Sequence, residues 1–138
     1  MKKLGVNYNY CADELYKEQF LFIWPNKGQR LKVKNLNNFL KEYFNPNVFV
    51  KDLKCSARYL EVERDEHPSY HVLILVQRDY SDSLQLSAMS HEANHCALNA
   101  LYLKGMRLDG TVSSEEPFCY YQEFILRHFI QSVFPSLR

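Results

Sequence analysis

Hydrophobic residues occur in short runs in the first half of the chain and at helical spacing in the second half. Short apolar runs bounded by Pro, Asn or Gly predict strands, and the apolar run from Val72 to Val76 predicts a buried central one. Strict alternation of apolar and basic residues at 30–34 predicts a half-exposed strand. The strands we expect are 19–24, 30–34, 48–50, 57–62 and 70–77, with a turn at 65–68 and a loop at 79–83.

Three helices are expected from the same pattern. Asn35 can cap a short amphipathic helix. The longest pattern is apolar almost all round and closes at Gly105, which predicts a buried central helix. Ser113 or Ser114 can cap the last helix. The expected bounds are 35–44, 84–104 and 116–133, while the first 17 residues show no clear period. Strands followed by two long helices, without regular βαβ alternation, predict a single α+β domain over residues 1–138.

Composition narrows the class of protein only slightly. The 138 residues include 17 Lys and Arg against 16 Asp and Glu, a net charge of +1, which disfavours a nucleic-acid partner. No apolar run is long enough to span a membrane, and no signal segment opens the chain, so we expect a cytoplasmic location. The four cysteines are scattered and form no CxxC pair, which is typical of reduced thiols.

A His-Glu-x-x-His motif lies in the longest predicted helix. His91 and His95 are four residues apart, so both imidazoles can reach one metal ion from the same helix face. Glu92 points about 100° away from His91, where it can act as a general base on a metal-bound water. Burying such a cluster in an apolar helix without a shared ion is costly. The alternative is a pair of solvent-facing or hydrogen-bonded histidines, with Glu92 in a surface ion pair.

A zinc site needs a third protein ligand, and a catalytic one keeps a fourth position open. Glu116, about 20 residues after His95 and near the start of the last helix, is the first candidate, and Glu115 is the second. Tyr120 or Tyr121 could stabilise an oxyanion, although a packed or surface tyrosine is the simpler interpretation. Acidic residues also favour helix N-termini because of the helix dipole, so the glutamate pair has a purely structural explanation as well.

Two further residues have simple structural interpretations. His71 follows His67 by four positions in a predicted strand, too far for both to share an ion. We expect a strand-surface histidine, and the alternative is a histidine that lines the edge of the cleft. Cys96 follows His95 directly, but neighbours on a helix diverge by about 100°, so we expect a core cysteine and not a nucleophile.

His91, Glu92 and His95, followed by a glutamate on the next helix, resemble the gluzincin branch of zinc metallopeptidases. More narrowly, residues 73–121 resemble small phage- and prophage-encoded zincin-like proteins. In these a strand, a His-Glu-x-x-His helix, a Gly turn and a Glu-Glu-Pro-Phe-x-Tyr segment follow one another. The resemblance covers about a third of the chain.

The resemblance implies a minimal zincin fold, a zinc ion (Zn²⁺) and a peptide or protein substrate. Glu92 would then activate water for attack on the amide bond. The chain has no room for the large second domain that builds the cleft in thermolysin-like enzymes. The alternative is a non-catalytic phage structural, assembly or host-interaction protein, in which the metal or a His–Glu cluster stabilises the helix pair. The oligomeric state is not predicted.

Overall fold

The computed structural model describes residues 2–3, 5–44, 48–64, 67–78 and 83–137. Its strands are β1 (Lys2–Lys3), β2 (Val6–Ala12), β3 (Gln19–Trp24), β4 (Ala57–Arg64) and β5 (His67–Leu75). Its helices are α1 (Val33–Tyr43), α2 (Ser83–Leu103) and α3 (Val112–Val133), followed by a short 3₁₀ turn at Pro135–Leu137.

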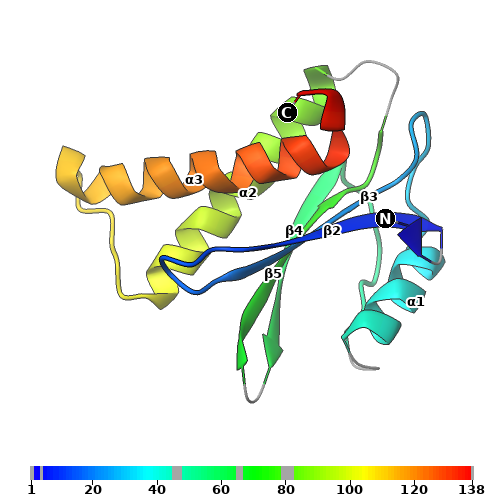
Figure 1. The fold of residues 1–138 in the computed structure, drawn as a ribbon, viewed down its shortest axis with the longest axis horizontal. Coiled ribbons are helices and arrows are strands. Elements are labelled where there is room, and N and C mark those ends of the chain that lie inside the picture. Colours follow the sequence, from blue (N-terminus) through cyan, green and yellow to red (C-terminus); the bar gives the residue numbers. More distant parts are fainter. Residues whose placement is uncertain (1, 4, 45–47, 65–66, 79–82, 138) are drawn as a thin grey trace.

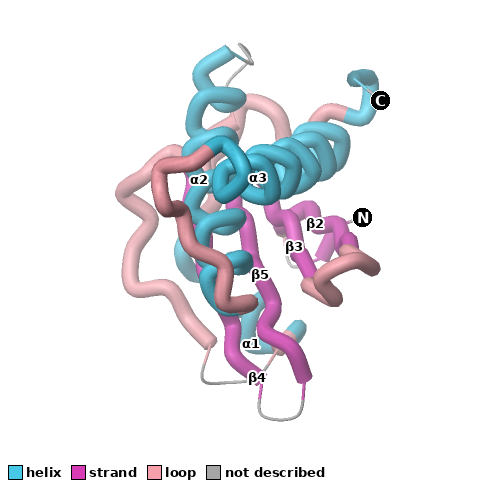
Figure 2. The backbone as a smooth tube through the Cα atoms, turned by 90° about the vertical axis from the view of Figure 1, so that its left-hand side faces the viewer, coloured by secondary structure: helices cyan, strands magenta, loops and turns pink. Residues whose placement is uncertain are grey.

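The strands form one mixed sheet with the order β1-β2-β3-β5-β4. Strands β3 and β5 run parallel at its centre, and the other pairs are antiparallel, which leaves β4 at an edge. Helices α2 and α3 cover one face of the sheet and α1 lies on the other (Figures 1 and 2). The fold is therefore α+β, as the sequence predicts.

The central strand β3 divides the molecule into two cores. Successive side chains of a strand point to opposite faces. Phe20 and Phe22 accordingly pack against α2 and α3, while Leu21 and Ile23 pack against α1, and all four side chains are fully buried. A strand buried on both faces needs a continuous apolar run, which is why residues 19–24 could be recognised from the sequence.

Helices α2 and α3 cross over the core that contains Phe20 and Phe22. Small residues of α2, Ala93 and Ala97 among them, are fully buried against α3, so the two helix backbones can approach closely. Helix α2 ends where Gly105 adopts a left-handed backbone conformation (φ +83°) and its N–H donates to the carbonyl of Tyr102 at 2.9 Å. Thr111 then caps α3 by accepting a hydrogen bond from the Ser114 N–H.

Several sequence predictions are confirmed and others are wrong. Segment 57–62 lies within β4, and 84–104 matches α2 to within one residue at each end. The predicted strand at 30–34 is wrong: Arg30 makes one isolated bridge to Gln77, and α1 begins at Val33. Alternation over five residues could not exclude a helix start, because apolar Leu31 and Val33 suit either structure.

The predicted strand at 48–50 is also absent from the described residues. Instead, the Asn37 side chain binds the backbone of Val50 on both sides, accepting from its N–H at 2.7 Å and donating to its carbonyl at 2.9 Å. Strand β2 was missed because its alternating Asn and Tyr residues carry no clear apolar signal. Asn35 lies inside α1, and the cap position is Lys32, without a side-chain hydrogen bond.

The predicted connections are described only in part. In the turn at 65–68, residues 65–66 lie outside the described residues, while His67 and Pro68 belong to β5. In the loop at 79–83, residues 79–82 lie outside the described residues, and Ser83 begins α2. Helix α3 begins at Val112, earlier than predicted, with Thr111 and not Ser113 or Ser114 at the cap position. Among the described residues, no helix is both long and apolar enough to cross a membrane.

Candidate functional site

His91 and His95 lie side by side on the outer face of α2. Their Nε2 atoms are 3.1 Å apart and their ring centroids 4.7 Å apart. Both side chains are exposed, so the expectation that this helix buries its polar cluster is wrong. The reason is the crossing of the helices: α2 buries the face that carries Ala93 and Ala97 and leaves the opposite face open.

The spacing of the two imidazoles fits a shared metal ion. Two nitrogens bound to tetrahedral zinc at 2.0–2.1 Å are about 3.3 Å apart, close to the separation in the structure. Without a metal, the same geometry is a hydrogen bond in which one ring donates its Nε2–H to the other ring. The pair therefore supplies two ligands whose positions are already set by the helix.

No third ligand joins this pair from the residues that the structure describes. Among the described residues, no group of three or more His, Cys, Asp or Glu side chains could hold a metal ion. Glu116 is exposed and precedes the buried Ile125 of α3 by nine residues, which turns it to the face of α3 opposite the core. The donors present thus fit a metal held by two histidines, and they do not fit the complete set of two histidines and a glutamate.

Two other predicted residues lie beside Glu116 on the first turns of α3. Glu115 is exposed in the first turn, where its charge favours the helix dipole. The side chain of Tyr120 is 69 % exposed and faces solvent. The structure brings none of these three side chains to the histidine pair, and their functional roles stay predictions.

Glu92 occupies a different setting from its histidine neighbours. It is half-buried between α2 and β4, and burial raises the pKa of its carboxyl group. The charges of His91 and His95, a hydrogen bond from the Tyr59 backbone and the charge of Arg58 oppose this shift in part. A carboxyl group whose pKa is raised is a stronger base, so it is better suited to take a proton from a neighbouring water.

A network of buried and half-buried polar side chains connects β4, β5 and α2, and the sequence did not predict it. The His71 Nε2 lies 3.0 Å from the Glu18 carboxylate, and its Nδ1 lies 2.7 Å from the Tyr59 hydroxyl. The Asn99 amide of α2 donates to that hydroxyl at 2.8 Å and to the Glu61 carboxylate at 3.1 Å. One chain of hydrogen bonds therefore joins the β2–β3 turn, both strands of the β4–β5 hairpin and α2.

The partners of His71 determine its tautomer. The Glu18 carboxylate can only accept, so the Nε2 of His71 carries the proton and donates it. The Nδ1 of His71 shares a hydrogen bond with the Tyr59 hydroxyl, whose oxygen accepts from Asn99. Lys104, 3.7 Å from Glu18, balances the charge of the carboxylate from the partly exposed side.

The strand-surface prediction for His71 is consequently wrong, because its side chain is fully buried. The available signal was its position at the start of the most apolar strand, where a polar residue needs a buried partner. The prediction for Cys96 is confirmed: it is fully buried in the core, and burial, with the charges of Glu18 and Glu61, raises the pKa of its thiol well above the ordinary value. Such a thiol is not a nucleophile at neutral pH.

Comparisons with known proteins add no family to this description. No family model matches the chain, and no curated protein or solved structure matches it significantly.

Removing the Tyr59 hydroxyl should destabilise the protein. Tyr59→Phe leaves the buried Nδ1 of His71 without a hydrogen-bond partner and is expected to lower the free energy of unfolding by about 1–3 kcal/mol. Tyr120→Phe, at a 69 % exposed position, is the matched control and should change it by less than about 0.5 kcal/mol. Urea unfolding of both variants measures the difference, and equal stabilities would show that the network contributes nothing.

Glu92 should lower stability at neutral pH and not at acidic pH. Its pKa is raised in the folded protein, so folding favours the protonated form, and the cost of ionising it appears as the pH rises through that pKa. Glu92→Gln is therefore expected to melt at a higher temperature than the natural protein at pH 7, with the gap closing near pH 4. Thermal melts across this range test the sign of the effect. If Glu92→Gln melts at a lower temperature than the natural protein at pH 7, the prediction is contradicted.

Proposed function

We propose that this protein is a metal-dependent peptidase whose centre is the outer face of α2, with His91 and His95 as metal ligands and Glu92 as general base. The observation that carries the proposal is the 3.1 Å approach of two exposed imidazole nitrogens. A bound zinc would supply Lewis-acid polarisation of a carbonyl and a more acidic water.

The half-buried carboxyl group supports the catalytic part of this proposal. Glu92 lies one residue from the first ligand, and its raised pKa suits it to accept a proton from water and to pass it to a leaving amine. Structural carboxylates in ion pairs usually show the opposite shift. The exposure of both histidines also leaves room for a substrate, which a purely structural, enclosed metal would lack.

The edge strand β4 supports a peptide as the substrate class. Helix α2 packs against β4, and Glu92 meets the backbone of Tyr59 on that strand. A sheet edge can bind an extended chain through main-chain hydrogen bonds. An extended substrate on this edge would pass beside Glu92.

A second candidate function is favoured by the lack of a third ligand among the described residues. This candidate is the non-catalytic structural or host-interaction protein of the alternative interpretation. In such a protein the histidine pair would bind a metal weakly or would remain a hydrogen-bonded pair. The exposed position of Glu116, away from the pair, agrees with this candidate.

Zinc affinity should depend on the histidines and not on the α3 glutamates. His95→Ala removes one of the two ligands and is expected to weaken zinc binding by more than about tenfold. Glu116→Ala should leave the affinity within about twofold of the natural protein, because its side chain faces away from the pair. Competition with a chromophoric chelator measures all three proteins. A loss in Glu116→Ala as large as that in His95→Ala would mean that α3 supplies the third ligand after all.

Hydrolysis should depend on Glu92 while metal binding does not. With fluorescein-labelled casein as the probe and zinc present, Glu92→Gln is expected to lose at least about a hundredfold in rate and to keep its zinc affinity. Glu123→Gln, an exposed glutamate on α3 paired with Arg127, is the matched control and should keep full activity. Full hydrolysis by Glu92→Gln would remove Glu92 from its assigned role, and zinc binding without casein hydrolysis by the natural protein would favour the non-catalytic candidate.

A further inference from the structure

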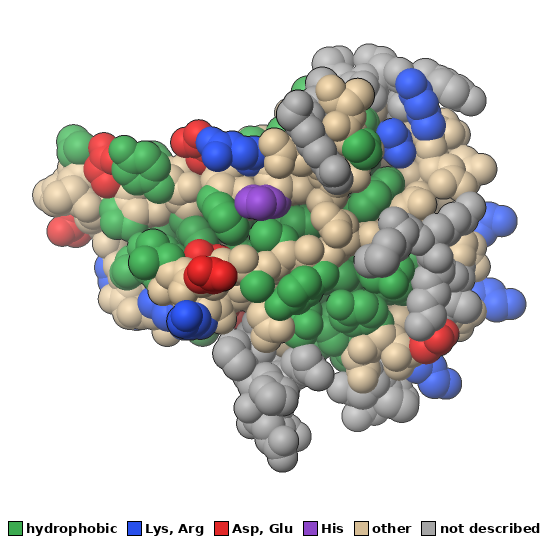
Figure 3. Space-filling view, in the orientation of Figure 1, with side chains coloured by type: hydrophobic (Ala, Val, Ile, Leu, Met, Phe, Trp, Pro, Cys, Tyr) green, Lys and Arg blue, Asp and Glu red, His purple; other side chains and the backbone are tan. Residues whose placement is uncertain are grey.

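The positive charge of the chain is concentrated in one segment. Residues 27–58 contain eight Lys and Arg against two acidic residues, Glu42 and Asp52, whereas the rest of the chain contains nine Lys and Arg against fourteen Asp and Glu. This segment includes α1 and the connection from α1 to β4. Lys and Arg side chains project around the end of the molecule where α1 lies in the space-filling view (Figure 3). The net charge near zero therefore hides a basic surface on the α1 side of the sheet.

Hydrogen bonds hold the connection from α1 to β4 in place. The Asn37 side chain of α1 binds both backbone groups of Val50. The Arg30 guanidinium donates to the carbonyl groups of Leu53 and Cys55. Val50 and Leu53 are buried, while residues 49, 51 and 54 are exposed. The connection is therefore a fixed part of the surface beside α1.

Four lysines lie on this surface, and we call Lys34, Lys41, Lys51 and Lys54 the lysine surface. Lys34 and Lys41 are seven residues apart, so they lie on the same face of α1 about 10 Å apart. Lys51 and Lys54 belong to the connection that Asn37 binds. All four side chains are exposed, and none forms an ion pair with a carboxylate of the described residues. Four such charges together attract an anion that carries several negative charges.

One large aromatic side chain stands among these lysines. Phe49 is 71 % exposed, although it directly precedes the buried Val50 and lies two residues before Lys51. Proteins that bind single-stranded nucleic acid combine a basic surface for the phosphates with aromatic rings on which unpaired bases stack. Phe49 and the lysine surface provide both parts of this arrangement.

We propose that the lysine surface and Phe49 bind a single-stranded nucleic acid, with its phosphates on the lysines and one base stacked on the Phe49 ring. A phosphate backbone supplies the repeated negative charge, and unpaired bases supply flat faces for stacking. An anionic membrane is a poorer partner, because α1 buries its apolar residues Leu36, Phe39 and Leu40 in the core and has no apolar face to insert into lipid. A duplex is a poorer partner as well, since its bases already stack on one another.

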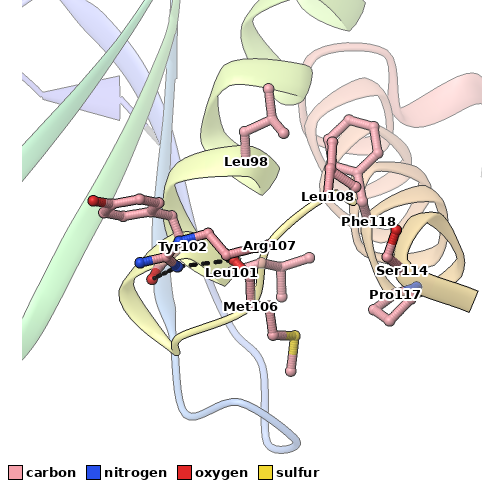
Figure 4. Close-up of a pocket in the computed structure, with 9 residues that line it drawn as sticks. All are labelled: Leu98, Leu101, Tyr102, Met106, Arg107, Leu108, Ser114, Pro117 and Phe118. Carbon is pink, nitrogen blue, oxygen red and sulfur yellow. Dashed lines mark hydrogen bonds between the residues drawn. The ribbon is translucent and has the colours of Figure 1, made fainter. Parts of the chain in front are cut away.

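The salt dependence of oligonucleotide binding tests the role of the lysines. The probe is a fluorescein-labelled oligothymidylate of about 20 nucleotides, and its anisotropy is followed between about 25 and about 200 mM salt. Contact with four phosphates predicts that log affinity falls with log salt concentration with a slope of about −3. Lys34→Gln and Lys51→Gln should each bring this slope closer to zero by about 0.7. Arg107→Gln removes the same charge where the arginine stacks on Tyr102 after α2 (Figure 4), and this matched control should leave the slope unchanged.

Removal of the aromatic ring separates stacking from charge. Phe49→Ala is expected to weaken binding of oligothymidylate about tenfold and to leave the salt slope unchanged. Tyr120→Ala replaces an aromatic side chain of α3 that is similarly exposed, at 69 %, and this control should keep the affinity of the natural protein. Equal affinities of Phe49→Ala and the natural protein would overturn the proposed stacking.

Two competing probes distinguish the partner classes. The natural protein is expected to bind oligothymidylate more tightly than a duplex of the same length, and more tightly than phosphatidylserine vesicles at the same concentration of negative charge. Tighter binding to either competitor, or no saturable binding of oligothymidylate at about 25 mM salt, would overturn the proposal. His95→Ala should bind oligothymidylate as the natural protein does, because α2 covers the opposite face of the sheet from α1. A failure of the proposed metal centre therefore leaves this result standing.

Discussion

The parallel pairing of β3 with β5 is the constraint from which the rest of the structure follows. Both strands are buried on both faces, so helices must cover each side of the sheet. The parallel direction also requires a long crossover, which α1 and β4 provide between the two strands. Strand β4 is thereby left at the edge, and α2, which directly follows β5, must pack across β5 and β4. The positions of His91, Glu92 and His95 depend on that packing.

The placement of α2 gives its faces different roles. The face with Ala93 and Ala97 is in the core, the face with Glu92 and Asn99 meets β4, and the face with the two histidines is open. The buried chain of hydrogen bonds from Glu18 to Asn99 fixes α2 against the β4–β5 hairpin. Tyr59 belongs to this chain through its side chain, and its backbone forms a hydrogen bond with Glu92. The buried network is therefore connected to the candidate general base through Tyr59.

The sequence predicts the features that depend on short-range hydrophobic patterns. It does not predict the features that depend on packing between elements far apart in the chain. Continuous apolar runs and helical spacing identified β3, most of β5 and α2, and the His91–His95 pair followed from helix geometry alone. Which face of α2 is open could not be predicted, because its apolar residues lie almost all round and only the crossing of α3 decides which of them are covered. The burial of His71 depended on partners more than 10 residues away in the chain, and the orientation of Glu116 depended on which side of α3 packs inward.

Anomalous scattering at the zinc absorption edge, from crystals grown with one equivalent of zinc, tests the central claim most directly. We predict a single strong peak on the outer face of α2, beside His91 and His95, with no carboxylate of α3 bound to the zinc. A histidine pair without an anomalous peak, or with the zinc bound at another part of the surface, would contradict the account.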